Sequence, residues 1–555
     1  MKALRNDRRE RLENFGSVFS KKWKNYFDLE GLIPGIEPTN EQAHVVQSSE
    51  KQLIIRGSAG SGKSLMLAYR LIKIMEQADS GKRILYVTFN QVLIDDTIKR
   101  LNQSEKYKEL SKKHSVEIVT YHNLVQDILT KSCGFSEMKR LYVTQASIEK
   151  HEDDIIGKIE IVLHHFRNSK EYHTLEKLFK THTARFLQEE FFWMKANGLI
   201  TEEKYLENER TGRGINPSVR MKQRSTIFHL FQKYNEFMKN NYSEIRLDME
   251  DYALYLLNEM AIRPNVAFRY DHILVDEFQD LQPMQIKSLV LLAKSTITLV
   301  GDDKQRIYKR SPLPYKELQL KLNPRTNHRL TKNFRSTKQI MDFAGSLKFL
   351  DTENVRDDDQ DFFREGIKPQ IIHFSSMERL ATKMIAEIKN IHQKKPHKTI
   401  AVIHRYTENE LRQEENIRFR LNREFDVVDI KKYGRKYNYN SVKKPIFFTT
   451  PYEIKGLEFD YVFIMHFDKE HYPLKLKVEE LNEKYNGRQI GDLHYDKDYD
   501  LIENEEKKLL YVACSRAKDE LHIYYVALKT RGISPFIRGI DTVLYDCNFK
   551  KTPYK

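Results

Sequence analysis

Short apolar runs alternate with amphipathic stretches along much of this chain. The first run, 51–55, leads into a glycine-rich loop, which is followed by an amphipathic helix expected over 65–75. Runs that are apolar on both faces and alternate with helices are typical of a parallel sheet covered by helices. We therefore expect buried parallel strands at 51–55, 83–88, 116–120, 273–275 and 297–300.

The pattern changes between Tyr121 and Tyr270, where the chain is charged and mostly helix-like, with aromatic residues at helical spacing. We predict a helical insertion into the first α/β unit. A second α/β pattern follows Asn323 and Pro324, with strands expected at 400–403, 446–450, 461–465 and 521–526. The prediction is an α/β protein with two parallel-sheet domains and a helical insertion domain. Its segments are a lead-in at 1–36, a first domain at 37–122 and 246–323, the insertion at 123–245, a second domain at 324–405 and 445–555, and a loop or small remnant at 406–444.

The amino-acid composition indicates which class of molecule this protein binds and in which kind of compartment it works. The chain has 555 residues and a formal net charge of +15, which favours a polyanion such as nucleic acid. No apolar run is long enough for a membrane span, and the charged first residues do not predict a signal peptide. With only three cysteines, a disulfide framework is excluded, and we expect a reduced, cytoplasmic setting.

The glycine-rich loop carries the clearest chemistry. Two glycines, a lysine and a serine at this spacing, between a strand and a helix, match the Walker A pattern. In that pattern backbone N–H groups surround phosphate oxygens, Lys63 faces the β and γ phosphates of ATP, and Ser64 faces Mg²⁺. The predicted nucleotide-binding residues of the loop are Gly57, Ser58, Ala59, Gly60, Ser61, Gly62, Lys63 and Ser64.

Two acids and two arginines complete a predicted hydrolytic site. Asp276 and Glu277 follow an apolar strand, so Asp276 can hold Mg²⁺ and Glu277 can orient or deprotonate a water. Gln305 would then sense the γ-phosphate. Arg335 and Arg516 lie in the second α/β unit, and we expect them to stabilise charge at the γ-phosphate when the two domains close.

Together these segments resemble the UvrD/Rep/PcrA group of superfamily 1 helicases, over most of the chain from Pro38 to Val526. The resemblance implies two RecA-like domains with ATP and Mg²⁺ between them. It further implies that Gln42 reads adenine, that Phe334 stacks on it, and that Glu458 touches the ribose, with Gly456 in the same binding segment. The motifs that carry the resemblance are NEQ (40–42), VTFN (87–90), VTYHNL (119–124), LVGDDKQRIY (299–308), NFRS (333–336), KGLEF (455–459) and YVACSRA (511–517).

Such motors hold a single strand by phosphate contacts and base stacking. The candidate contacts are Phe89, Asn90, Tyr121, His122 and Tyr308. For His122, a structural histidine with satisfied hydrogen bonds is nearly as good an interpretation.

The chain also departs from that group. Only about forty residues, 406–444, stand where these helicases carry their 2B domain, too few for a domain of ordinary size. The segment 466–504 is charged and rich in tyrosine, and no structure is predicted for it. In the insertion, 193–214 resembles the HelD branch of UvrD-like helicases.

The leading hypothesis is an ATP-dependent helicase or translocase on single-stranded or tailed duplex DNA, moving 3′ to 5′ as the resemblance implies. One alternative is a HelD-like remodeller that acts on RNA polymerase. Another is the motor or sensor component of a two-component phage-defence system, in which a nuclease partner would cut the DNA.

Overall fold

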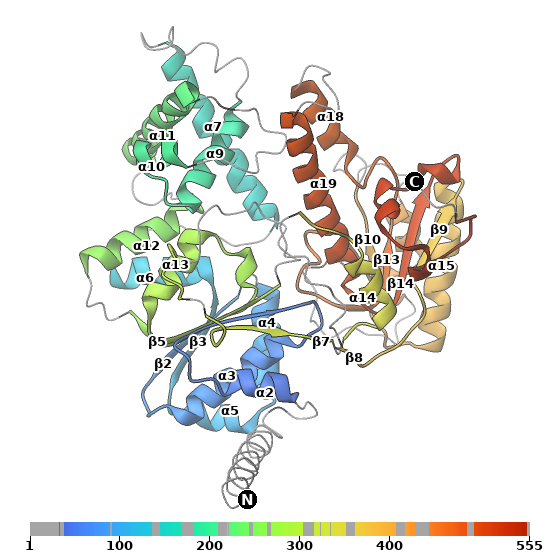
Figure 1. Cartoon of the computed structure of the whole chain (residues 1–555), viewed down its shortest axis with the longest axis horizontal. Helices are drawn as coiled ribbons and strands as arrows, with labels where there is room; N and C mark the ends of the chain where they lie inside the picture. The colour runs from blue at the N-terminus through green and yellow to red at the C-terminus, as the bar shows by residue number, and fades with distance from the viewer. Residues whose placement is uncertain are drawn as a thin grey trace, which may run out of the picture.

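The computed structural model describes most of the chain in segments. They are residues 33, 38–88, 91–135, 145–168, 183–208, 219, 221–242, 248–263, 268–302, 316–321, 323–333, 335–350, 361–406, 417–428, 430, 443–484 and 493–551. The predicted fold class is confirmed, because two parallel sheets are each covered by helices and a helical unit is inserted into the first (Figure 1).

Within the described residues, the first sheet has six parallel strands in the order β3-β2-β4-β5-β1-β6. Its buried strands are rich in isoleucine, leucine and valine, which suits a sheet packed on both faces. The bounds are β1 Gln52–Gly57, β2 Arg83–Thr88, β3 Ser115–Thr120, β4 Tyr270–Val275, β5 Ala293–Gly301 and β6 Asn327–Leu330.

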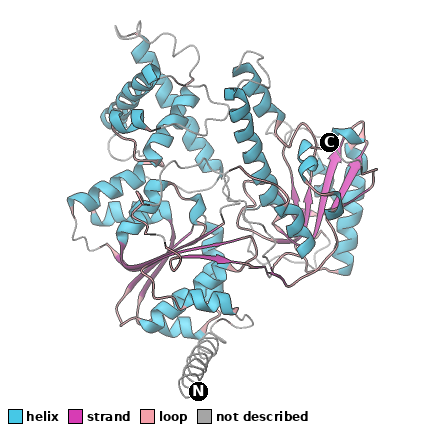
Figure 2. Cartoon of the chain, in the orientation of Figure 1, coloured by secondary structure: helices cyan, strands magenta, loops and turns pink. Residues whose placement is uncertain are grey.

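Helices cover both faces of this sheet (Figure 2). One apolar core joins it to α2 (Asn40–Val46), α3 (Lys63–Gln77) and α5 (Glu105–Leu110). The other joins it to α6 (Tyr121–Ser132), α12 (Asp251–Ile262) and α13 (Pro283–Leu292). Helix α4 (Gln91–Leu101) packs beside α3.

The insertion has a core of its own, which in its described part is built mainly from aromatic and aliphatic side chains of four helices. They are α7 (Gln145–Arg167), α9 (Ala184–Ala196), α10 (Glu202–Glu207) and α11 (Met221–Tyr242). Since α6 packs into the core of the first domain, the predicted start of the insertion at residue 123 is wrong. The independent helical core begins with α7.

As far as the structure describes the second domain, its sheet has seven parallel strands in the order β11-β12-β10-β13-β14-β9-β15. Their bounds are β9 Gln370–Phe374, β10 Ile400–Ile403, β11 Asp426–Val428, β12 Pro445–Thr449, β13 Phe459–Ile464, β14 Ala517–Val526 and β15 Asp546–Cys547. The α-helices described in this domain are α14 (Lys338–Gly345), α15 (Met377–Lys394), α17 (Ile417–Glu424), α18 (Lys475–Lys484) and α19 (Leu493–Cys514).

Three further expectations change with this topology. Strand β6 pairs with β1, so the first domain extends past the predicted boundary at 323 to Leu330. The described part of 406–444 contributes α17 and β11 to the second domain, and is neither a loop nor a separate remnant. The segment 466–504 contains α18 and the first half of α19, two helices that pack against each other.

The chain passes between the two domains at Thr331. Directly after it, β7 (Lys332–Asn333) pairs with β8 (Asp361–Phe362) in a separate two-stranded ladder. In the described part of the chain, no helix is long and apolar enough to span a membrane.

Candidate nucleotide site between the two domains

The phosphate-binding loop runs from the end of β1 to the start of α3. Gly60 and Gly62 have φ values of 87° and 77°, a left-handed conformation that favours glycine. A Cβ at Gly60 would lie 2.5 Å from Oδ1 of Asn333, and one at Gly62 would lie 2.6 Å from Nε2 of Gln42. The loop therefore fits closely between helix α2 on one side and the second domain on the other.

Lys63 is folded into this loop. Its Nζ donates to the carbonyl oxygens of Gly57 at 2.9 Å and Ser58 at 2.8 Å, and the residue is 7% exposed. A γ-phosphate would offer this ammonium group a charged acceptor in place of two neutral ones. Charge-assisted hydrogen bonds are about twice as strong as neutral ones.

Gln42 is engaged within the protein. Its Nε2 donates to the carbonyl of Ser61 at 2.9 Å, and its Oε1 accepts from the backbone N–H of Thr39 at 3.0 Å, which forms a capping box at the start of α2. The amide keeps a second N–H and a second lone pair, so the predicted contact with adenine is compatible with both bonds. In this structure the side chain supports the loop.

The two acids follow β4. Asp276 is 2% exposed and accepts from the hydroxyl of Tyr86 at 3.2 Å, and Ser64 also bonds to it. Burial, together with the neighbouring Glu277, raises the pKa of Asp276 to about 6. A pair of adjacent carboxylates with excess negative charge, beside a serine hydroxyl, fits a hard divalent cation, so Ser64 and Asp276 would hold Mg²⁺.

Glu277 sits in a left-handed conformation, with φ 52°. Burial tends to raise the pKa of its carboxyl, but the charges of Lys63 and Lys455 and a hydrogen bond from Gln279 lower it below its ordinary value. Glu277 is thus held as a carboxylate, the form that accepts a proton from water.

The second domain completes the site. Arg516 is 1% exposed and is oriented by the carbonyls of Val512 and Leu457 and by the hydroxyl of Ser515. Burial and the nearby Arg335 lower the pKa of Arg516. Arg335 itself forms an ion pair with Glu458.

These groups line one cavity, formed by residues from both domains. It measures about 60 Å³, whereas pockets that bind small molecules are typically ~300–1,000 Å³, so the cleft must widen to admit a nucleotide. The structure thus brings together predicted residues that are far apart in the sequence. The predicted residues on its lining are Ala59, Gly60, Gly62, Lys63, Ser64, Asp276, Glu277, Arg335, Gly456, Glu458 and Arg516.

Sequence reasoning missed an ion pair beside the cavity. Lys455 of the second domain pairs with Asp280, which lies three residues after Glu277 in the first, and their side chains are only 8% and 2% exposed. Asp280 is close in sequence to Glu277, and Lys455 is close in sequence to Glu458. This closeness to assigned site residues is the sequence signal that could have identified the pair. Helix α4 was also missed as a wall of the cavity, to which it contributes Leu93, Asp96, Thr97 and Arg100.

Two of the predicted nucleic-acid contacts, Tyr121 and His122, are buried in the structure. Tyr121 is 1% exposed and its hydroxyl bonds to Ser288 at 2.7 Å, while His122 is 8% exposed and packs between Tyr121 and Tyr252. Burial lowers the pKa of His122 to about 4. Neither ring offers a face to a base, so both assignments are corrected to core residues. Phe89, Asn90, Gln305, Tyr308 and Phe334 lie outside the described residues.

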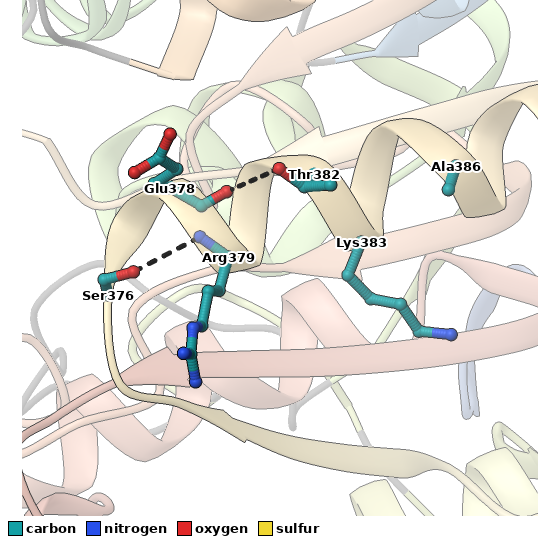
Figure 3. A pocket seen from close by; sticks show the side chains of 6 residues that line it. All are labelled: Ser376, Glu378, Arg379, Thr382, Lys383 and Ala386. Atoms are coloured by element: carbon teal, nitrogen blue, oxygen red, sulfur yellow. Dashed lines mark hydrogen bonds between the residues drawn. The ribbon is translucent and has the colours of Figure 1, made fainter.

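A second hollow of about 590 Å³ follows one face of α15 (Figure 3). It lies on a single helix and its N-cap, where Ser376 accepts from the backbone N–H of Arg379 and Thr382 donates to the carbonyl of Glu378. These hydroxyls are used within the helix itself. None of the predicted site residues lies there.

Comparison with known proteins agrees with this geometry. Residues 38–310 match the UvrD/REP helicase N-terminal domain, and residues 432–527 match the UvrD-like helicase C-terminal domain. Together the two family models match more than half of the chain. The insertion's likeness to the HelD branch stays a prediction.

Several curated proteins that are similar to this chain are described as DNA helicases. YjcD of Bacillus subtilis, described as a putative ATP-dependent DNA helicase, is 24% identical over 64% of this chain and 44% of its own length. A DNA helicase II homologue of Mycoplasma capricolum is 25% identical over 66% of this chain and 48% of its own. One component of an ATP-dependent helicase/nuclease of Lactococcus lactis is 33% identical, over 22% of this chain and 11% of its own.

The chain spans about half the length of the first two of these relatives. Two parallel-sheet domains meet at a phosphate-binding loop, an acid pair and two arginines, and both domains match models of one family. The chain therefore belongs to the UvrD-like helicases of superfamily 1.

Proposed function

We propose that this protein is an ATP-driven DNA motor that moves along single-stranded DNA, in the 3′ to 5′ direction that its family resemblance implies. The observation that supports this most directly is the composition of the cavity. The phosphate-binding loop and the acids come from the first domain, whereas Arg335, Glu458 and Arg516 come from the second. Hydrolysis at such a site depends on closure of the cleft.

The assigned residues of the cavity have separate roles in ATP hydrolysis. Lys63 and the loop N–H groups bind the β and γ phosphates, and Glu277 orients the attacking water. Arg335 and Arg516 stabilise the charge that develops on the γ-phosphoryl group. Ser64 and Asp276 would hold Mg²⁺, which would supply positive charge to the phosphates. Reopening after hydrolysis would then advance one domain relative to the other along the strand.

The contacts with DNA rest on sequence alone. Phe89, Asn90 and Tyr308 remain the proposed stacking and phosphate contacts. Base stacking on an aromatic ring contributes about 1–3 kcal/mol per base. With a basic chain, we expect binding to weaken as salt concentration rises.

The first test is ATP hydrolysis with and without single-stranded DNA, with Lys63→Ala as the blank. We expect strong stimulation by DNA in the wild type, none in Lys63→Ala, and loss of turnover with retained DNA binding in Glu277→Gln. Wild-type turnover in Glu277→Gln would refute its catalytic role. Absence of any Lys63-dependent hydrolysis would refute the motor itself.

Direction and unwinding need a second assay. Duplexes with a 3′ tail or a 5′ tail, each carrying a fluorophore and a quencher, separate the two polarities. We expect unwinding, or displacement of a bound streptavidin block, only on the 3′-tailed substrate. Displacement without strand separation would restrict the proposal to a translocase.

A nuclease partner is proposed on one observation, the match to a component of a helicase/nuclease. Affinity purification of the tagged protein from its own host, followed by mass spectrometry, would test it. Recovery of RNA polymerase in place of a nuclease would favour the remodeller alternative.

A further inference from the structure

Asn333 occupies the junction between the two domains. It is the last residue of β7, two residues after the crossing at Thr331, and is 0% exposed. Its Nδ2 donates to the carbonyl oxygen of Ala59, in the phosphate-binding loop, at 2.7 Å. A side chain that follows the first sheet is thus bonded to the loop that would hold the nucleotide phosphates.

The other end of the same amide organises the turn that carries Arg335. Oδ1 of Asn333 accepts from the backbone N–H of Arg335 at 3.0 Å and from that of Ser336 at 3.3 Å. An asparagine that bonds to backbone groups two and three residues ahead stabilises a turn locally. The backbone of Arg335 therefore follows the position of the Asn333 amide.

The turn is also tied to the second arginine. Ser336 is 0% exposed, and its hydroxyl donates at 2.7 Å to the carbonyl of Ala517, the residue directly after Arg516. One continuous set of hydrogen bonds therefore leads from Ala59, through Asn333 and Ser336, to the backbone beside Arg516.

Packing leaves little room for the loop to move alone. A Cβ at Gly60 would approach Oδ1 of Asn333 to 2.5 Å and Cβ of Arg335 to 2.8 Å. At the crossing between the domains, the carboxylate of Glu41 in α2 accepts from the backbone N–H of Thr331 at 3.1 Å. The chain is therefore anchored to the first domain at Thr331, and Asn333, two residues later, bonds to the loop itself.

We propose that Asn333 is a positioning residue that couples the state of the phosphate-binding loop to the placement of Arg335 and, through Ser336, of Arg516. This inference rests on the proposed ATPase function and deepens it. Phosphate bound in the loop would shift the carbonyl of Ala59, and the Asn333 amide would carry that shift to the arginine-bearing turn. Asparagine suits this role because one planar amide donates on one side and accepts on the other.

The decisive variant is Asn333→Asp. Aspartate keeps an acceptor for the N–H groups of Arg335 and Ser336 but cannot donate to Ala59. Asn548→Asp is the matched control, since Asn548 donates to the carbonyl of His373 at 3.0 Å and accepts from its N–H at 2.9 Å, on an exposed edge of the second sheet. Asn333→Ser is a second variant, which keeps a turn-forming hydroxyl on a side chain too short to reach the loop.

Steady-state ATP hydrolysis with saturating DNA and titration with a fluorescent ADP analogue are the measurements. We expect kcat to fall about 10–100-fold in Asn333→Asp and Asn333→Ser, the size of effect that a small misplacement of a catalytic group produces. The affinity for the ADP analogue should stay close to that of the wild type, and Asn548→Asp should behave as the wild type does.

A mutant cycle separates positioning from a general structural role. If Asn333 acts through the arginines, Asn333→Asp should cost little further in a protein that already carries Arg335→Ala. Full additivity, or a wild-type kcat in both variants, would overturn the inference while leaving the ATPase proposal intact. A wild-type protein without Lys63-dependent hydrolysis would overturn both.

Discussion

Removal of Lys455 should act on the cleft and not on the fold of either domain. Its ammonium pairs with the carboxylate of Asp280, 175 residues earlier in the chain and in the other domain. The same ammonium is one of the charges that lower the pKa of Glu277. The variant Lys455→Ala therefore takes a positive charge away from the buried carboxylate of Asp280 and from the partly buried carboxylate of Glu277.

The burial of the Lys455–Asp280 pair determines how much free energy the loss of Lys455 costs. With side-chain exposures of 8% and 2%, solvent screens the two charges very little. Removing one partner of a buried ion pair typically costs about 3–5 kcal/mol. Because the partners belong to different domains, this cost falls on the closed cleft. It corresponds to a shift of about 10²–10⁴-fold in the ratio of closed to open protein.

Two measurements check this. DNA-stimulated kcat should fall at least about tenfold, since each tenfold step corresponds to only ~1.4 kcal/mol. Small-angle scattering of the nucleotide-free protein should show a larger radius of gyration. The double variant Asp280→Asn/Lys455→Met should regain the compact shape, because no lone charge would then be buried at the interface.

Lys398→Ala is the control. Lys398 lies 3.0 Å from Asp460 and 2.8 Å from Asp519, all within the second domain, and its side chain is 38% exposed. Because Lys398 and both carboxylates belong to one domain, the cost of breaking these pairs falls on that domain and not on the cleft. If Lys455→Ala keeps the kcat and the radius of gyration that Lys398→Ala shows, the ion pair does not hold the cleft closed and the reasoning is refuted.

Two further predictions concern Arg516 in the site and Glu250 at the start of α12. Arg516→Ala should lower kcat about 10³–10⁵-fold while binding of an ADP analogue changes little, and a kcat near that of the wild type would exclude Arg516 from the chemistry. Burial and the neighbouring Asp248 and Asp251 raise the pKa of Glu250 from 4.5 to about 8, so the folded protein keeps a proton that the unfolded chain has lost. Stability should therefore decrease as pH rises from about 4.5 to 8, and Glu250→Gln should flatten that decrease in thermal unfolding curves. Unchanged pH profiles would contradict this assignment.

Local pattern was enough to predict the two sheets and the phosphate-binding loop. Strand β1 is apolar on both faces, and the glycines after it are required by φ values of 87° and 77° at Gly60 and Gly62. Such features depend on neighbouring residues alone. Arg335 and Arg516 could be named for the same reason, because each lies within a recognisable motif.

The predictions from sequence were least accurate where a strand or side chain contacts a segment far away in the sequence. Strand β6 has only four residues, and nothing in them shows that they extend the first sheet beside β1. Tyr121 follows a strand as a base-stacking residue could, yet its hydroxyl is used by Ser288, 167 residues later. In both cases the partner is chosen by the packing of distant segments.

The sequence by itself determined the chemistry that this protein carries: a phosphate-binding loop, two acids, two arginines and a basic chain. Only the tertiary structure decided how these groups depend on one another. It placed Lys455 against Asp280 and Asn333 against Ala59, pairs separated by 175 and 274 residues. The physical reason is that a short-range hydrogen bond or ion pair across two domains forms only when both folds are complete and the cleft between them is closed.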